Sequence, residues 1–212
     1  MQNTHNIDRR VIYLLLFVSV AIALAIPKMR LPFIASQQSL GAYNAIQHAP
    51  VDKIAVIGAE WSAGTEGENG SQTKALLNHV MRRHIKFAIL GFDPQGPENV
   101  GKIAQDLAAQ YGYVYGRDWI NFGYRPPGAI NPILKAFTAD VVAAIKLDVN
   151  GTPLTDYAKL PIMRNFHDIN QVGIIIEITP SSTYENWVAF VQGVKGTTMV
   201  VAPTAVMAPE CY

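Results

Sequence analysis

Short apolar runs that alternate with amphipathic stretches are the feature that most constrains the fold of this chain. The runs are continuous and rich in branched residues, which is typical of strands buried on both faces of a parallel sheet. We expect strands at residues 53–58, 86–92, 118–122, 172–178 and 197–202. Strands that alternate with helices favour right-handed crossovers, with helices on both faces of a mostly parallel sheet.

The stretches between the runs carry helix signals. The clearest helix begins at Gly96-Pro97, where proline is tolerated, and ends at Gly112. Further helices are expected at 71–84, at 131–144 and after the capping-box pattern of Ser182 to Glu185. The sequence therefore predicts an α/β domain with a doubly wound, mostly parallel sheet of about five strands, Rossmann-like or flavodoxin-like, whose strand order the pattern leaves open.

An uncharged stretch from Val11 to Pro27 precedes this domain. A helix that spans a bilayer needs about 20 apolar residues, with a lower limit of about 17. A cleaved signal peptide could use Ala23-Leu24-Ala25 as its cleavage site, and a buried core helix is a third interpretation. The cleavage triplet lies inside the apolar run, so we expect a retained anchor.

The resulting domain organisation has four parts. Residues 1–10 form a short polar N-terminus, 11–27 a transmembrane anchor, 28–50 a juxtamembrane connector and 51–212 the α/β domain. Basic residues flank the anchor on both sides, and the free amino terminus favours a cytoplasmic N-terminus. We therefore expect a single-pass membrane protein whose large domain is extracytoplasmic.

Charge and cysteine content exclude several classes of function. The chain holds 17 Lys and Arg against 16 Asp and Glu, a net charge of +1. No basic face is indicated, so nucleic acid is not an expected partner. The single cysteine, Cys211, excludes internal disulfides and cysteine-based zinc sites. The expected partners are the lipid bilayer and another membrane or envelope protein.

Ligands of doubly wound sheets bind beyond the carboxyl ends of the strands. Glu60 and Asp93 follow the first two expected strands and are the candidate catalytic residues, as an acid/base pair or a cation-binding pair. The candidate ligand-binding residues follow the third and fourth strands: Tyr124, Arg125, Gly128, Thr179 and Ser181.

The familiar cofactor motifs are missing from these loops. The loop after the first strand lacks the GxxxxGK[ST] spacing that cradles phosphates, and GxGxxG is absent from the chain. The five histidines show no metal-ligand spacing. The sequence therefore predicts no cofactor and no metal site.

Three stretches carry a resemblance to a known family. They are Tyr111 to Ala129, which includes Gly-Tyr-Arg-Pro-Pro-Gly, then Asn150 to Leu154, and Trp187 to Gly193 with the following Thr204 to Tyr212. With them the chain resembles an uncharacterised family of bacterial membrane-anchored α/β-domain proteins. The resemblance implies that the chain is truncated at its C-terminus and that the family continues through a strand–helix segment and often a second membrane segment.

The chain departs from that family at two places on the expected rim. Pro127-Gly128 stands where the family usually has Gly-Gly, and Glu60 to Glu68 replaces an Asp-rich loop. The resemblance implies no activity.

Three functional hypotheses remain open, and whether the chain is an enzyme is among the open points. The first is a binding or assembly module that recognises a partner or small ligand through the Tyr124–Gly128 rim. The alternative is a membrane-anchored hydrolase or transferase that uses Asp93 and Glu60. The third is a nucleotide or sugar-phosphate sensor in which Arg125 binds the anion.

Overall fold

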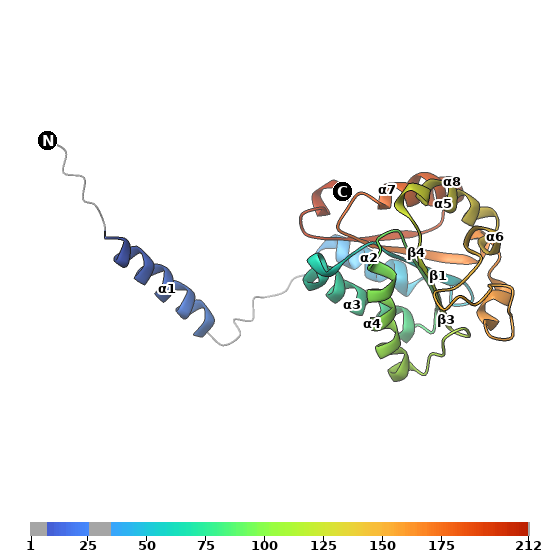
Figure 1. Cartoon of the computed structure of the whole chain (residues 1–212), viewed down its shortest axis with the longest axis horizontal. Coiled ribbons are helices and arrows are strands. Elements are labelled where there is room, and N and C mark those ends of the chain that lie inside the picture. Colours follow the sequence, from blue (N-terminus) through green and yellow to red (C-terminus); the bar gives the residue numbers. More distant parts are fainter. Residues whose placement is uncertain (1–7, 26–34, 212) are drawn as a thin grey trace. The chain divides into compact units, whose positions relative to one another are not determined.

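A computed structural model describes residues 8–25 and 35–211 of the chain. Contacts divide the chain into two units, Met1–Ser36 and Gln37–Tyr212. The first unit contains the helix α1 (Arg9–Ala25), and the second contains a five-stranded sheet with its covering helices (Figure 1).

Helix α1 covers most of the expected anchor. It has 17 residues, and its apolar side chains are exposed, with Phe17 at 71% and Leu14 at 61%. Ile26 and Pro27, the end of the expected span, lie outside the described residues, as do residues 28–34 of the connector. No helix in the described part of the chain combines the length and apolar character needed to cross a bilayer, so the expected span is not supported there.

The second unit is built on an all-parallel sheet with the order β3-β2-β1-β4-β5. The strands are β1 (Ile54–Ala59), β2 (Lys86–Gly91), β3 (Trp119–Tyr124), β4 (Val172–Thr179) and β5 (Met199–Pro203). This confirms the predicted α/β fold. The order is that of a Rossmann-type sheet, in which the chain reverses direction across the sheet between β1 and β4.

Helices cover both faces of the sheet (Figure 1). One face carries α2 (Gln37–Gln47), α3 (Ser71–Arg82) and α4 (Gly96–Tyr111). The other carries α5 (Ile130–Ala139), α6 (Val141–Ile145), α7 (Tyr184–Trp187) and α8 (Gly193–Lys195). The connector helix α2 packs on the domain through Ile46, which is fully buried.

Short 3-10 and π turns link these elements. They are Ala63–Thr65, Glu66–Gly70, Pro127–Ala129, Pro161–Asn165, Ile169–Gln171, Val188–Gln192 and Ala208–Cys211.

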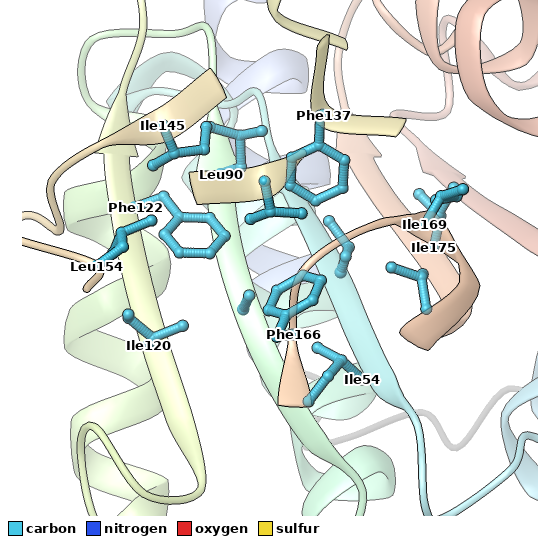
Figure 2. Packing of buried hydrophobic residues seen from close by; sticks show 14 of the residues in the cluster. Ile54, Leu90, Ile120, Phe122, Phe137, Ile145, Leu154, Phe166, Ile169 and Ile175 are labelled. Carbon is cyan, nitrogen blue, oxygen red and sulfur yellow. The ribbon is translucent and has the colours of Figure 1, made fainter. Parts of the chain in front are cut away.

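Each face of the sheet has its own apolar core. On the α5 side, the rings of Phe122, Phe137 and Phe166 pack together, with centroids 6.0 and 5.9 Å apart for the two pairs that involve Phe166 (Figure 2). Phe122 is on β3 and Phe166 is in the long segment that leads to β4, so this cluster fixes the crossover against the sheet. Aromatic contacts of this kind stabilise a core beyond the area that they bury.

The clearest predicted helix is confirmed, whereas the predicted helix at 131–144 is divided. Helix α4 begins at Gly96 and is followed by Gly112 in the left-handed conformation, with φ of 68°. Asp140 has an extended backbone between α5 and α6, and its carboxylate accepts the N–H of Ala143 at 2.9 Å. Aspartate favours this capping position, which explains the break.

The predicted capping box at Ser182–Glu185 is wrong. Thr183 is the N-cap of α7 and makes no side-chain cap hydrogen bond. Its hydroxyl instead donates to Glu177 at 3.1 Å, because a buried carboxylate lies beside it. This contact belongs to the candidate site.

Candidate functional site

The strand order decides which of the predicted site residues can meet. Glu60 and Asp93 follow the adjacent strands β1 and β2, and Tyr124 ends the next strand, β3. Thr179 ends β4, three strands away from β3, which is roughly 14 Å at the usual strand spacing. The predicted residues therefore form two groups, one at the β1–β4 switch and one at the β3 edge.

Glu60 is buried beside the end of β2. Its side chain is 4% exposed, and its two carboxylate oxygens accept the backbone N–H of Phe92 at 2.8 and 3.1 Å. Burial raises the pKa of Glu60 to about 7, and the negative charge of Asp93 acts in the same direction. The carboxyl can thus exchange a proton near neutral pH.

Asp93 lies close to Glu60, as expected, but its carboxylate has a structural task. Oδ1 accepts the backbone N–H of Gln95 at 2.8 Å and that of Gly96 at 3.1 Å. These bonds hold the loop that opens helix α4. The first turn of a helix has free N–H groups, and an aspartate that accepts from them stabilises it.

Glu177 is the residue that the sequence-based prediction missed. It lies within β4, is fully buried, and accepts the Thr183 hydroxyl through Oε1. Its Oε2 is buried and has no hydrogen-bond partner among the described residues. Burial and the charge of Glu60 raise the pKa of Glu177 well above its usual range. The signal in the sequence was one glutamate within the otherwise apolar run VGIIIEI.

Thr179 and Ser181 belong to a hydroxyl cluster that leads to Glu177. The Thr179 hydroxyl lies 2.8 Å from that of Thr183 and 3.1 Å from that of Ser181. Thr183 in turn donates to Glu177. The cluster connects a half-buried serine at the loop surface with a buried carboxyl group.

A pocket of about 560 Å³ lies at the β3 edge, between helix α4, strand β3 and residues 149–150. Its floor is organised by Asn121, which is 4% exposed. The Asn121 amide donates to the carbonyl of Pro97 at 2.8 Å and accepts the N–H of Gly123 at 2.8 Å. Gly101 allows this packing, because a Cβ there would lie 2.8 Å from the Asn121 side-chain nitrogen.

The outer wall of the pocket is a turn held by Asp148. The Tyr115 hydroxyl donates to its Oδ2 at 2.8 Å, and its Oδ1 accepts the N–H groups of Asn150 at 2.9 Å and Thr152 at 2.7 Å. Burial and Asp148 raise the pKa of Tyr115, so its hydroxyl stays protonated. Tyr124, with 38% of its surface exposed, also lines the pocket.

Arg125 and Gly128 are near this pocket in the chain but do not line it. Arg125 Nη1 donates to the carbonyl of Tyr124 at 2.9 Å, and Nη2 donates to the carbonyls of Ile145 and Leu147 at 3.0 and 3.1 Å. The guanidinium therefore fixes the end of α6. Gly128 lies exposed in the turn Pro127–Ala129.

Within residues 8–25 and 35–211, no three His, Cys, Asp or Glu side chains are grouped so that they could hold a metal ion. Comparisons with models of known protein families, with curated proteins and with solved structures found no match. The resemblance to a family of membrane-anchored proteins stays a prediction.

Proposed function

We propose that the chain is a membrane-anchored α/β binding module, and that the pocket at the β3 edge holds its small-molecule ligand. The observation that carries this proposal is the pocket itself. Its volume of about 560 Å³ is typical of small-molecule sites, which combine apolar and aromatic walls with a few fixed polar groups. Asn121 and the Tyr115–Asp148 pair supply polar groups that are already held by hydrogen bonds.

The lining favours binding over turnover. No histidine, cysteine, serine or threonine is among the described residues that line the pocket. Its two charged residues, Glu98 and Lys102, pair with each other at 2.7 Å on the helix surface. The remaining lining residues carry amides, aromatic rings, prolines, two glycines and a valine, which suit contact with a ligand better than acid/base chemistry.

A thermal-shift screen of the full chain in detergent tests this function. A compound present at about 100 times its Kd adds about 2.7 kcal/mol of stability. Tyr124→Ala removes an aromatic wall, and we expect it to weaken binding about tenfold, or about 1.4 kcal/mol. Val188→Ala is the matched control, because Val188 is 39% exposed and lies outside the pocket. A hit that responds equally to both variants would place the ligand elsewhere.

A specific observation also favours a second candidate function, a membrane-anchored hydrolase or transferase. Glu60 and Glu177 are buried carboxyl groups whose charges interact at the β1–β4 switch, and proton-exchanging groups with shifted pKa values are typical of catalytic sites. In this candidate function Glu177, and not Asp93 as expected from the sequence, is the second carboxyl group beside Glu60. Glu60→Gln should then abolish turnover of a substrate while it leaves the Kd of the β3-edge ligand unchanged; turnover that survives in Glu60→Gln removes this candidate.

The membrane anchor is the third part of the proposal. It is supported by exposed apolar side chains along α1 and by Ser19, whose hydroxyl donates to the carbonyl of Leu16 at 2.9 Å and so needs no water. At 1.5 Å per residue the 17 residues extend about 26 Å, against about 30 Å of hydrocarbon. Carbonate extraction should leave the full chain in the membrane pellet and release a Leu15→Arg/Phe17→Arg variant. We place the large domain outside the cytoplasm, and reporter fusions at the C-terminus test that side.

A further inference from the structure

The outer edge of β5 presents backbone groups that nothing in the described chain pairs. Ile175 N–H donates to the Thr198 carbonyl at 2.9 Å, and Thr204 N–H donates to the Thr179 carbonyl at 3.2 Å. In a parallel ladder these bonds alternate, so residues 198, 200, 202 and 204 face β4. The N–H and C=O groups of Met199 and Val201 therefore point away from the sheet.

A large groove runs along this edge. It has a volume of about 1300 Å³, and its lining includes all five residues of β5 together with side chains of α2 and α3. Residues from both faces of one strand can line a single groove only where the groove follows the strand edge. Gln72 marks one end, where its side-chain amide donates to the Pro203 carbonyl at 2.7 Å.

The other end of the groove is basic. Arg82 and Arg83 line it at the end of α3, and neither forms an ion pair within the described chain. Burial, and then the charges of these two arginines, lower the pKa of His79, which stacks on Tyr43 with ring centroids 4.5 Å apart. Glu68 also lines the groove, but its carboxylate accepts the Ala205 N–H at 2.7 Å.

We propose that β5 docks an extended acidic segment of a partner protein, which adds a sixth strand to the sheet. Its backbone pairs with the outward groups of Met199 and Val201. Its acidic end lies beside Arg82 and Arg83, near the start of β5, because α3 runs antiparallel to the strand from Gln72 at the far end. Two copies paired edge to edge about a two-fold axis would run antiparallel, so Arg82 and Arg83 of each would meet the Gln72 end of the other. Among the described residues the one carboxylate in the groove lining is Glu68, which already accepts the Ala205 N–H, so charge favours an acidic segment of a different protein.

The test is peptide selection on the full chain. Random heptapeptides displayed on phage are selected against the protein in detergent, and the best peptide is measured by fluorescence polarisation. We expect acidic residues at one end, alternating apolar residues in the remainder, and at least tenfold weaker binding to Arg82→Glu/Arg83→Glu. Selected peptides without acidic residues, or binding that the charge reversal leaves unchanged, overturn the proposal.

A backbone variant tests the strand addition separately. Val201→Pro removes one outward N–H and no bond to β4, so the fold tolerates it at a sheet edge. We expect it to abolish peptide binding with an unchanged circular dichroism spectrum; Met199→Pro serves the same purpose if Val201→Pro fails to fold. Peptide binding that survives either folded variant contradicts strand addition. A dimer in light scattering that Val201→Pro dissociates would assign the edge to a second copy and overturn the acidic partner.

Discussion

Gly58 and Glu177 share one space between two neighbouring strands. They are paired in register in β1 and β4, and a Cβ added to Gly58 would coincide with Oε2 of the Glu177 carboxyl group. A glycine in a strand often marks such a close approach. The absent side chain in β1 therefore makes room for the buried carboxyl group of β4, at the point where the sheet reverses its direction of winding.

The first prediction concerns this pair. Gly58→Ala should destabilise the domain by about 1 to 3 kcal/mol, since overpacking forces side chains and backbone apart. Glu177→Ala in the same chain should recover part of that loss, whereas the equally large Gln should not. Urea unfolding of the unchanged chain, of Gly58→Ala, of Glu177→Ala and of the double variant measures the coupling between the two positions. If Gly58→Ala lowers the free energy of unfolding equally in the unchanged chain and in the Glu177→Ala variant, the added methyl group does not meet the Glu177 carboxyl group.

The second prediction concerns pH. The folded state raises the pKa of Glu60 from 4.5 to about 7 and that of Glu177 well above 4.5. At a pH between the unfolded and folded pKa values of these groups, the folded chain binds more protons than the unfolded chain. The free energy of unfolding therefore falls as the pH rises from about 4.5 through 7. Glu177→Gln should reduce this fall and make the protein more stable at pH 8, because a buried amide stays neutral without taking up a proton, whereas the buried carboxyl group must either take up a proton or carry a charge.

Melting curves from pH 4.5 to 8 measure this effect. Glu185→Gln is the control, because Glu185 is an exposed residue of the neighbouring helix α7. Its profile should follow that of the unchanged chain. If the melting temperatures of the Glu177→Gln and Glu185→Gln variants depend on pH in the same way, Glu177 is not a source of the pH dependence.

The third prediction separates structure from catalysis at Asp93. The Asp93 carboxylate accepts two N–H groups before and at the start of α4, so Asp93→Ala should cost about 1 kcal/mol. Asp93→Asn keeps an accepting oxygen and should lose less. Thermal unfolding checks both variants. An Asp93→Asn protein of unchanged stability that has lost a measured activity would return Asp93 to a catalytic role.

The fourth prediction concerns Arg125, which was expected to bind an anion. Its guanidinium donates to the carbonyls of Tyr124, Ile145 and Leu147. Arg125→Ala should therefore destabilise the domain by roughly 1.5 to 3 kcal/mol, the range for hydrogen bonds to charged groups. Arg125→Lys should recover little, since an ammonium group cannot reproduce the fork geometry. Phosphate-dependent stabilisation that disappears in Arg125→Lys would instead support the anion-binding interpretation.

The sequence predicted the strands well because each is a short apolar run that only a doubly covered sheet can bury. The helix α4 was equally clear, since Gly96-Pro97 and Gly112 mark both of its ends. The division of the helix at Asp140 was missed, because the apolar pattern continues past this residue and outweighed the N-cap preference of aspartate.

The candidate site was less predictable than the fold. Glu60 and Asp93 follow consecutive strands, and these strands are neighbours in the sheet, while the catalytic role of the two residues stays a prediction. The grouping of Tyr124 with Thr179 failed, since it depends on the strand order, which local patterns do not contain. Glu177 was treated as part of a strand, because the space that it occupies exists only through Gly58 on another strand.

Hydrogen exchange with a hit from the thermal-shift screen tests the central claim most directly. With the compound at saturation, the amides of residues 94–105, 115–124 and 148–151 should exchange more slowly, because these segments surround the β3-edge pocket. Residues 199–205, at the distant sheet edge, should be unaffected. Protection confined to residues 199–205, or to residues 177–183 at the β1–β4 switch, would contradict a ligand site at the β3 edge.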